Sequence, residues 1–279
     1  MRAQTAVAPT RLRPSWGAQL NLPMRHWQGQ RVWLVGASSG IGLACAQALH
    51  KAGAQVLLSA RDLGHLTAWA QASALPGAGA GVELFPMDVT DAQQVQTAAL
   101  KVLAGGPIDL IVYCAGHYSP QCATSFDLAQ MLRHQDVNYC GLLRVLAAVL
   151  PNMLAQGHGH ISLVSSVAGW RGLPKSLAYG PTKAAVTNLA DTLYLDLKDH
   201  GIGVSVVHPG FVDTGLTAQN TFQMPALISK EQAAKEMLQG WAQGLFEIHF
   251  PKRFTLWLML MRMLPHRIYF ALVRRVTQL

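Results

Sequence analysis

"RVWLVGASSGIGLACAQALHKAG", residues 31–53, decides the fold class. Its first part, 31–37, is an apolar run typical of a buried strand, and its second part, 40–53, has the apolar spacing of a helix that ends at Gly53. Gly36, Gly40 and Gly42 lie at the junction, where they permit a tight turn and let backbone N–H groups approach an anion at the positive end of the helix. This order of strand, glycine turn and helix predicts a dinucleotide-binding unit.

Short apolar runs continue to alternate with helical periods as far as residue 210. We expect further strands over 54–61, 81–89, 108–116, 159–169 and 203–210. We expect helices over 63–74, 91–104, roughly 127–155 and 177–200, with Pro151 marking a bend or boundary late in the third of these. Strands that are apolar throughout are covered on both faces, and right-handed crossovers join them. The pattern therefore predicts an α/β fold, a Rossmann-like doubly wound parallel sheet in three αβα layers.

The composition and the position of the charges limit the function classes. Of the 279 residues, 51% are hydrophobic and 13% charged, which is enough apolar material for a large core. The net charge is +8, but residues 1–30 contain four arginines and no acid, and residues 247–279 have a net charge of +5. The body between them is nearly neutral, so we expect no nucleic-acid partner. The basic ends either contact an anionic surface such as phospholipid or only keep the ends in solution.

The four cysteines are scattered and form no C-x-x-C pair, which favours a reducing compartment and a cytoplasmic location, peripheral on a membrane if the basic ends bind one. Residues 1–27 lack the apolar segment of a secretory signal; they resemble a transit segment weakly, and we expect a flexible N-terminal extension. We expect one domain over 28–250 and an apolar, basic, helical C-terminal extension over 251–279.

The end of the second expected strand bears on the choice of cofactor. A carboxylate at this place would hold the adenosine ribose diol, as in NAD sites, but the chain has Ala60 there. Arg61 is suited to pair with a 2′-phosphate, with Ser38 beside it, whereas Asp62 is better placed to cap the next helix. We therefore expect NADP(H) rather than NAD(H), the alternative being that Arg61 is only a solvated side chain.

"SLAYGPTKA", residues 176–184, contains Tyr179 and Lys183 at a spacing that places both on one face of a helix. Hydride transfer to a carbonyl leaves an alkoxide that must be protonated, and a phenol whose pKa a neighbouring ammonium lowers can donate that proton. Ser166, at the end of the fifth expected strand, could polarise the carbonyl. Each residue alone is equally typical of an ordinary helix or strand end, so the prediction depends on their combination.

Seven stretches in order resemble the short-chain dehydrogenase/reductase family in its NADP-preferring Tyr-x-x-x-Lys form, over about residues 28–215. They are "GASSGIG", "MDVTD", "YCAG", "VNYCG", "LVSSVAG", "AYGPTKAA" and "HPGFVDT". The resemblance implies a catalytic set of Asn138, Ser166, Tyr179 and Lys183, with Ser166 chosen over Ser165. In it, Asn138 would anchor a water linked to the lysine, and Lys183 would also hold the nicotinamide ribose. The chain departs from the family at Tyr113-Cys114, where two asparagines are usual.

The same resemblance implies where a cofactor binds. We expect contacts from Gly36, Ser38, Ser39, Gly40, Ile41, Gly42, Arg61, Asp88, Val89, Ala115, Gly116, Tyr179, Lys183, Pro209, Gly210, Val212 and Thr214. No metal is expected, because His158 and His160 lie in a glycine turn without acidic or thiolate neighbours. His117 and Tyr118 either line the substrate mouth or belong to a plain loop.

The segment after Thr214 is expected to form an apolar substrate lid over about 215–230, before a helix over 229–244 that Ser229 and Gln232 cap. In the tail, the apolar run Phe254–Met261 is too short to span a bilayer. Two interpretations remain open for it. It could be an interfacial helix or hairpin on a membrane, or a cover for the substrate pocket or an oligomer interface, since the resemblance implies a dimer or tetramer.

The sequence thus predicts an NADP(H)-dependent oxidoreductase that interconverts a carbonyl and an alcohol on an apolar small molecule. The stretch "EIHFPKRF" resembles the tail of reductases of lipid-like ketones and aldehydes. Two alternatives are a non-catalytic NADP(H)-binding scaffold or sensor, and a 3-oxo-acyl or 3-ketosphinganine-type reductase. A sugar-nucleotide epimerase or dehydratase fits the apolar lid poorly.

Overall fold

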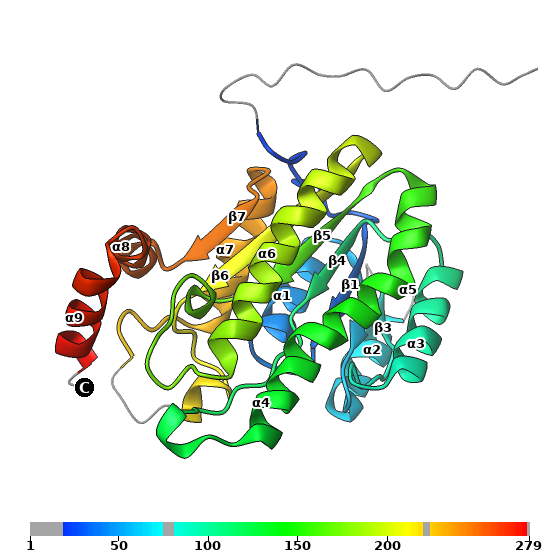
Figure 1. Ribbon diagram of the computed structural model, residues 1–279. Coiled ribbons are helices and arrows are strands. Elements are labelled where there is room, and N and C mark those ends of the chain that lie inside the picture. The colour runs from blue at the N-terminus through cyan, green and yellow to red at the C-terminus, as the bar shows by residue number, and fades with distance from the viewer. Residues whose placement is uncertain (1–18, 75–80, 220–223, 278–279) are drawn as a thin grey trace, which may run out of the picture.

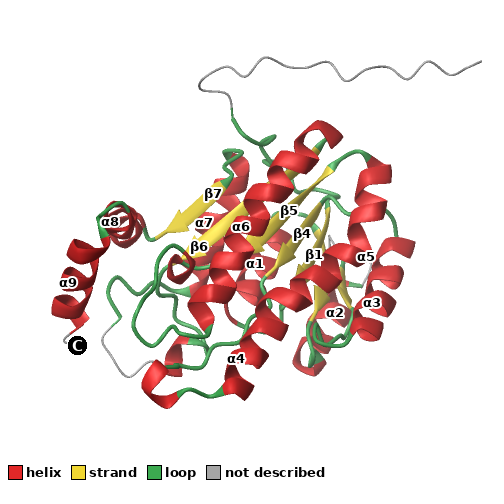
Figure 2. Ribbon diagram, viewed as in Figure 1, coloured by secondary structure: helices red, strands yellow, loops and turns green. Residues whose placement is uncertain are grey.

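The computed structural model describes residues 19–74, 81–219 and 224–277 and contains a seven-stranded parallel sheet between helices (Figures 1 and 2). The strands are β1 (Arg31–Val35), β2 (Gln55–Ser59), β3 (Val82–Leu84), β4 (Leu110–Tyr113), β5 (Gly159–Val164), β6 (Ile202–Pro209) and β7 (Glu247–Phe250). Their order across the sheet is β3-β2-β1-β4-β5-β6-β7. The chain adds strands toward one edge as far as β3 and then, from β4 on, toward the other edge, while all strands stay parallel. This order confirms the predicted doubly wound α/β fold.

Helices cover both faces of the sheet (Figure 2). They are α1 (Gly40–Lys51), α2 (Thr67–Ser73), α3 (Ala92–Ala104), α4 (Leu128–Gln135), α5 (Gly141–Gln156), α6 (Tyr179–Leu197), α7 (Lys230–Ala242), α8 (Lys252–Arg262) and α9 (His266–Thr277). Short 3-10 turns lie at Gly64–Leu66, Ala123–Ser125, Val167–Gly169, Lys198–His200 and Thr217–Gln219. Buried residues of α3, α5 and α6 form one core with the sheet, and those of α1 and α7 form the other.

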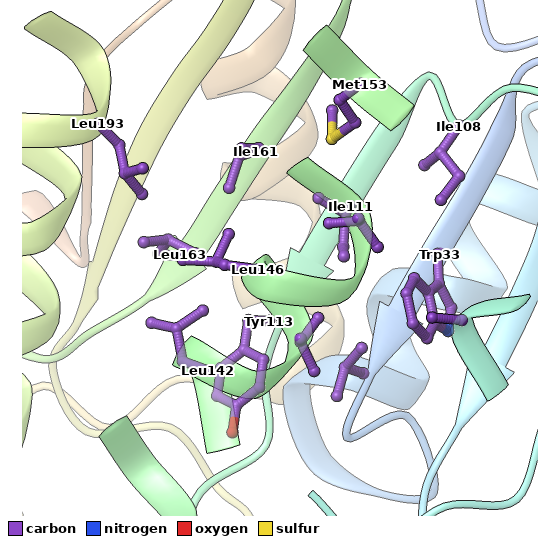
Figure 3. Packing of buried hydrophobic residues seen from close by; sticks show 14 of the residues in the cluster. Trp33, Ile108, Ile111, Tyr113, Leu142, Leu146, Met153, Ile161, Leu163 and Leu193 are labelled. Atoms are coloured by element: carbon purple, nitrogen blue, oxygen red, sulfur yellow. The ribbon is translucent and has the colours of Figure 1, made fainter. Parts of the chain in front are cut away.

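The core on the α5 side holds β4 and β5 in place (Figure 3). Leu142 and Leu146 of α5 lie over Tyr113 of β4 and Leu163 of β5, and all four are almost fully buried. Apolar side chains on both strands make this packing possible, and their burial stabilises the sheet by about 25 cal/mol per Å² of apolar surface. The carboxyl ends of β4 and β5 are therefore held at a fixed spacing.

The predicted helix over roughly 127–155 is a composite of α4, a π-helical segment (Asp136–Cys140) and α5. The helix continues through Pro151 to Gln156, so Pro151 is not its boundary. Residues 128–156 are long and apolar enough to cross a membrane by length and composition. However, α5 packs Leu142, Val145, Leu146, Val149 and Met153 on the sheet, and we assign this segment as a core helix.

The N-terminal boundary lies earlier than predicted. Residues 1–18 of the expected flexible extension are outside the described residues, but 19–27 pack on the domain. The amide of Asn21 donates to Val204 O at 2.8 Å and accepts from Val204 N at 3.0 Å. Trp27 is buried, with its ring edge-on to Trp241 at 5.9 Å. The expectation of flexibility up to residue 27 is therefore wrong for this part, because the segment makes long-range contacts with β6 and α7.

Two further predictions concern the C-terminal third. The helix expected over 229–244 is α7, and Ser229 caps it by accepting from the N–H of Gln232 at 3.1 Å. The tail was expected to begin at 251, and it forms the helices α8 and α9. The expected lid over 215–230 includes residues 220–223, which lie outside the described residues, and it stays a prediction.

Candidate active site

A cleft of about 1080 Å³ opens at the carboxyl ends of the strands. Its walls come from the turns after β1, β2, β3, β4, β5 and β6 and from the start of α6. Every residue of the predicted catalytic and cofactor-binding sets lines it except Asn138, which lies buried behind the wall. The structure therefore brings together groups that are far apart in the sequence, at the edge where open α/β sheets bind ligands.

The glycine turn after β1 is packed so closely that side chains cannot be added. A Cβ on Gly36 would lie 2.4 Å from Ala115 N, and a Cβ on Gly42 would lie 2.3 Å from Gly36 O. Gly40 has a φ of +57°, in the left-handed region. Ser39 precedes α1 without a side-chain capping bond, and the first turn of α1 has no acid. The bare, positive helix end facing the cleft fits the pyrophosphate of a dinucleotide.

The end of β2 places Arg61 on the wall of the cleft that Ser38 also lines. Asp62 accepts from Gly64 N at 2.9 Å, but the N-cap residues of the following 3-10 turn and of α2 are Leu63 and Leu66, so the prediction that Asp62 caps the next helix is wrong. No ion pair of Arg61 is recorded within the described ranges. Its exposed guanidinium is therefore placed to meet an anion. His65 was not predicted as a site residue, but its Nε2 lies 2.9 Å from Ser38 O and supports the glycine turn.

The ends of β3 and β4 form the middle of the cleft. Asp88 accepts from Thr90 N at 2.9 Å and Thr90 Oγ1 at 2.8 Å, which fixes the carboxylate at the wall. A Cβ on Gly116 would lie 3.7 Å from Asn138 Oδ1 and 3.9 Å from Lys183 Nζ. The small residue after β4 thus keeps the cleft open where the two polar side chains approach it.

The turn after β6 closes the other side of the glycine turn. A Cβ on Gly40 would lie 3.2 Å from the methyl group of Thr214. Thr217 Oγ1 donates to Val212 O at 2.6 Å and accepts from Thr214 N at 3.1 Å, so the threonines hold this turn together. The remaining predicted contacts of this turn, Pro209 and Gly210, also line the cleft.

Tyr179 begins α6 and lies in the cleft beside Ser166. Burial raises the pKa of Tyr179 from 10.0 to about 12, and a hydrogen bond with the Ser166 hydroxyl lowers it in part. We predicted that Lys183 lowers the pKa of Tyr179, but this pKa is raised. The surrounding residues shield the phenol from water, and the Lys183 ammonium is 5.5 Å from the centre of the Tyr179 ring. The phenol is consequently protonated at neutral pH, the form that can donate a proton.

Lys183 is buried one helical turn beyond Tyr179. Its ammonium donates to Val164 O at 2.9 Å, and burial lowers its pKa from 10.5 to about 8. Ser165 does not play the same part as Ser166. Its hydroxyl is buried and donates to Lys183 O at 2.7 Å. This geometry favours Ser166 over Ser165 as the group that faces a substrate.

Asn138 lies in the π-helical segment and is fully buried. Its amide oxygen accepts from His117 N at 2.6 Å, and its amide nitrogen donates to His117 O and to Thr182 Oγ1, both at 3.0 Å. Asn138 thereby ties the turn after β4 to the helix of Tyr179 and Lys183. π-Helical segments leave the usual helical bonding pattern and are frequent at functional sites.

The part of the cleft wall that α4 and the π-helical segment contribute was not predicted from the sequence. It consists of Leu132, Arg133, Gln135, Asp136, Val137 and Cys140. The spacing of residues 132, 136 and 140 at every fourth position could have predicted this wall, because Asn138 lies in the same helical stretch. In the segment after β4, the ring of Tyr118 lies edge-on to Tyr179 at 5.1 Å, and that of His117 lies 4.5 Å from His134.

Comparison with known proteins agrees with this geometry. Residues 30–224 match the family model described as short chain dehydrogenase. An "Uncharacterized oxidoreductase" of Myxococcus xanthus is 35% identical over 245 residues, which cover 87% of this chain and 96% of that protein. A second such oxidoreductase, from Staphylococcus haemolyticus, is 31% identical over 221 residues, or 79% of this chain and 94% of that protein.

Two solved structures share the fold. One is a short chain dehydrogenase from Burkholderia cenocepacia in complex with NADP, with a TM-score of 0.74, 24% identity, and coverage of 88% of this chain and 98% of that chain. The other is a short-chain type dehydrogenase/reductase from Mycobacterium ulcerans, with a TM-score of 0.73, 26% identity, and coverage of 81% and 89%. The family match, the sheet order and the residues that line the cleft agree: the chain belongs to the short-chain dehydrogenase family of NAD(P)-dependent oxidoreductases.

Proposed function

We propose that this protein uses NADP(H) to interconvert a carbonyl and an alcohol on an apolar small molecule. One observation carries the proposal: Tyr179 and Ser166 lie together in a cleft that begins at a glycine turn suited to a dinucleotide, and the raised pKa of Tyr179 keeps its phenol protonated. A carbonyl oxygen placed between these two hydroxyls would meet one group that orients it and one that protonates it.

The preference for NADP(H) is supported by the end of β2. Ala60 lines the cleft where a ribose-binding carboxylate would stand, and the nearest acid, Asp62, is engaged with Gly64 N. Arg61 and Ser38 would hold the 2′-phosphate there through a guanidinium and a hydroxyl. The other cofactor contacts predicted from the sequence are proposed to act as described above.

In the proposed mechanism, each of four side chains has a separate role. Bound NADPH would supply a hydride to the carbonyl carbon. Ser166 would orient the carbonyl oxygen, and Tyr179 would give it the phenolic proton. Lys183, with an ammonium that is still mostly charged at neutral pH, would stabilise the phenolate that results and hold the ribose hydroxyls. Asn138 would position the turn after β4 and the water that returns a proton through the lysine.

The substrate end of the cleft supports an apolar and lipid-like substrate. Val164, Val137 and Leu216 line the cleft, and Tyr118 packs against the catalytic ring. His117 adds a polar group at the mouth, where its Nε2 lies 3.1 Å from Gln130 Oε1. We also propose a homo-oligomer, a dimer or tetramer. Its contacts would be made by α5 and α6, because these helices expose large apolar side chains on their outer faces: Leu143, Leu154 and Leu195.

The test is a panel of aldehydes and ketones of increasing chain length, with consumption of NADPH and NADH followed by absorbance. We expect turnover with NADPH and a kcat/KM that rises with chain length, because each buried methylene adds about 0.8 kcal/mol. Tight NADPH binding without turnover across the panel would instead identify a scaffold or sensor. Faster turnover of short polar carbonyls than of long ones would refute the apolar site.

A further inference from the structure

Helices α8 and α9 carry an unusual combination of charge and exposed apolar surface. The sequence has no Asp or Glu after Glu247, whereas the two helices contain Lys252, Arg253, Arg262, Arg267, Arg274 and Arg275. Large apolar side chains on the same helices are exposed: Leu256, Trp257, Leu260, Ile268, Phe270, Leu272 and Val276, with Met263 between the helices. Exposed apolar surface of this extent marks an interaction site.

Five of these apolar residues form a stripe along each helix. Leu256 and Leu260 are four residues apart on α8, and Ile268, Leu272 and Val276 repeat every fourth residue on α9. Arg275 lies next to the α9 stripe, whereas Arg267 and Arg274 lie on the opposite face of the helix, one on its first turn and one on its last. A helix with an apolar face and a face rich in Lys or Arg is typical of helices that lie in a membrane interface.

The two helices are fixed to the body of the protein at the active-site loop. Arg171 Nη1 donates to Arg262 O at 3.0 Å and to Leu264 O at 2.7 Å, and its guanidinium lies 4.0 Å from the ring centre of Tyr269. Tyr269 in turn donates to Gly172 O at 2.8 Å. Arg171 and Gly172 belong to the loop after β5, which also carries Ser166. The stripes therefore cannot swing freely relative to the cleft.

The first turn of α8 also contacts the other side of the cleft. The ring of Phe254 lies 5.5 Å from that of Phe211, the residue after Gly210 on the cleft wall. Figure 1 shows α8 and α9 beyond β7, outside the two helix layers and on the side toward which the strands point. Helices α8 and α9 thus lie at the same edge of the molecule as the cleft, which opens at the carboxyl ends of the strands.

Charge decides between a membrane and a second copy of this chain as the occupant. A symmetric contact between two copies of α8 and α9 would bring arginines against arginines, with no carboxylate side chain on these helices to pair with them. An anionic bilayer supplies the missing negative charge and an apolar layer for the stripes. With 11 residues, α8 is about half the length needed to span a bilayer, so it would lie in the interface.

We propose that α8 and α9 dock the protein on the surface of an anionic phospholipid bilayer, with the cleft mouth held next to the lipid. An apolar substrate dissolved in the bilayer would then reach the cleft without crossing water. The docking itself needs no turnover, so it stands or fails independently of the proposed reduction.

Sedimentation of the full-length protein with vesicles tests this proposal. We expect binding to phosphatidylcholine vesicles that contain phosphatidylserine, and far weaker binding to phosphatidylcholine alone. Arg267→Gln with Arg274→Gln should weaken partitioning about 25-fold, since each cation near an anionic surface contributes about fivefold. Lys51→Gln with Lys101→Gln, which removes two exposed cations from α1 and α3, is the matched control and should bind like the unmodified protein.

A second pair of variants tests the exposed apolar surface of α8. Trp257→Ala should weaken binding about tenfold, because a buried aromatic side chain is lost from the interface. Leu100→Ala, a large exposed apolar residue on α3, should leave binding unchanged. The proposal is overturned if the protein stays in the supernatant with both vesicle types. It is also overturned if Trp257→Ala dissociates an oligomer in sedimentation velocity while vesicle binding is absent, since the stripe would then belong to a second copy.

Discussion

Replacement of Tyr179 by Phe removes the hydroxyl that donates the proton in the proposed mechanism. The change removes one hydroxyl and keeps the ring, which packs edge-on to Tyr118 at 5.1 Å and under the Lys183 ammonium at 5.5 Å. The loss of one hydrogen bond with Ser166 costs about 1 kcal/mol of folding stability. General acid catalysis contributes roughly 10²- to 10⁴-fold, equivalent to about 3–5 kcal/mol, so activity should fall far more than stability.

The assay follows NADPH consumption with the best carbonyl from the panel, alongside NADPH binding by fluorescence. We expect kcat to fall by at least about 100-fold, with cofactor affinity within about twofold of the unmodified protein. Tyr194→Phe is the matched control, because Tyr194 lies on the same helix and donates to Leu20 O, away from the cleft. If Tyr179→Phe keeps the unmodified kcat, the assignment of the proton donor is refuted.

Three further predictions concern the cofactor site, the buried lysine and the N-terminal segment. Arg61→Ala should lower kcat/KM for NADPH roughly 10- to 100-fold and leave that for NADH nearly unchanged, and an equal loss for both would contradict the 2′-phosphate assignment. The pKa of Lys183 is about 8, so its positive charge is lost as the pH rises through this value. We therefore expect kcat/KM for NADPH to decline above about pH 8, and a constant kcat/KM up to about pH 10.5 would contradict this role of Lys183. Asn21→Ala should lower the free energy of unfolding in urea by about 2–3 kcal/mol, against little change for the exposed Asn188→Ala.

The fold and the strand-end residues were predictable because each depends on local signals. Apolar runs identify buried strands, and glycines such as Gly36 and Gly42 are required where backbone segments approach more closely than a Cβ permits. Parallel connection then brings the carboxyl ends of the strands to one edge, whatever their separation in the sequence. The approximate position of the candidate site follows from this topology.

The elements that were missed lack such signals. β7, "EIHF", is a four-residue edge strand that alternates polar and apolar residues, and its pairing of Val206 with Glu247 depends on tertiary contact with β6. Residues 19–27 have no regular period, and Asn21 is held through bonds to a strand far along the chain. Contacts of this kind are fixed by the assembled surface and leave little trace in the local pattern.

The electrostatics of the site were also beyond the sequence. Spacing alone placed Lys183 next to Tyr179 and suggested that the ammonium controls the phenol. The structure adds the burial of both groups, which raises the pKa of Tyr179 and lowers that of Lys183. Burial of each group depends on the packing of the loops around the cleft, and that information is distributed over the whole chain.

Transfer of deuterium tests the central claim most directly. The protein would be incubated with the best carbonyl of the panel and NADPH that carries deuterium at both positions of the transferring carbon, and the alcohol would be analysed by mass spectrometry. The proposed hydride transfer predicts that the product carries deuterium on the former carbonyl carbon, and that the Tyr179→Phe protein forms far less of it. An alcohol formed without deuterium, or no alcohol from any carbonyl although NADPH binds, would contradict the proposed function.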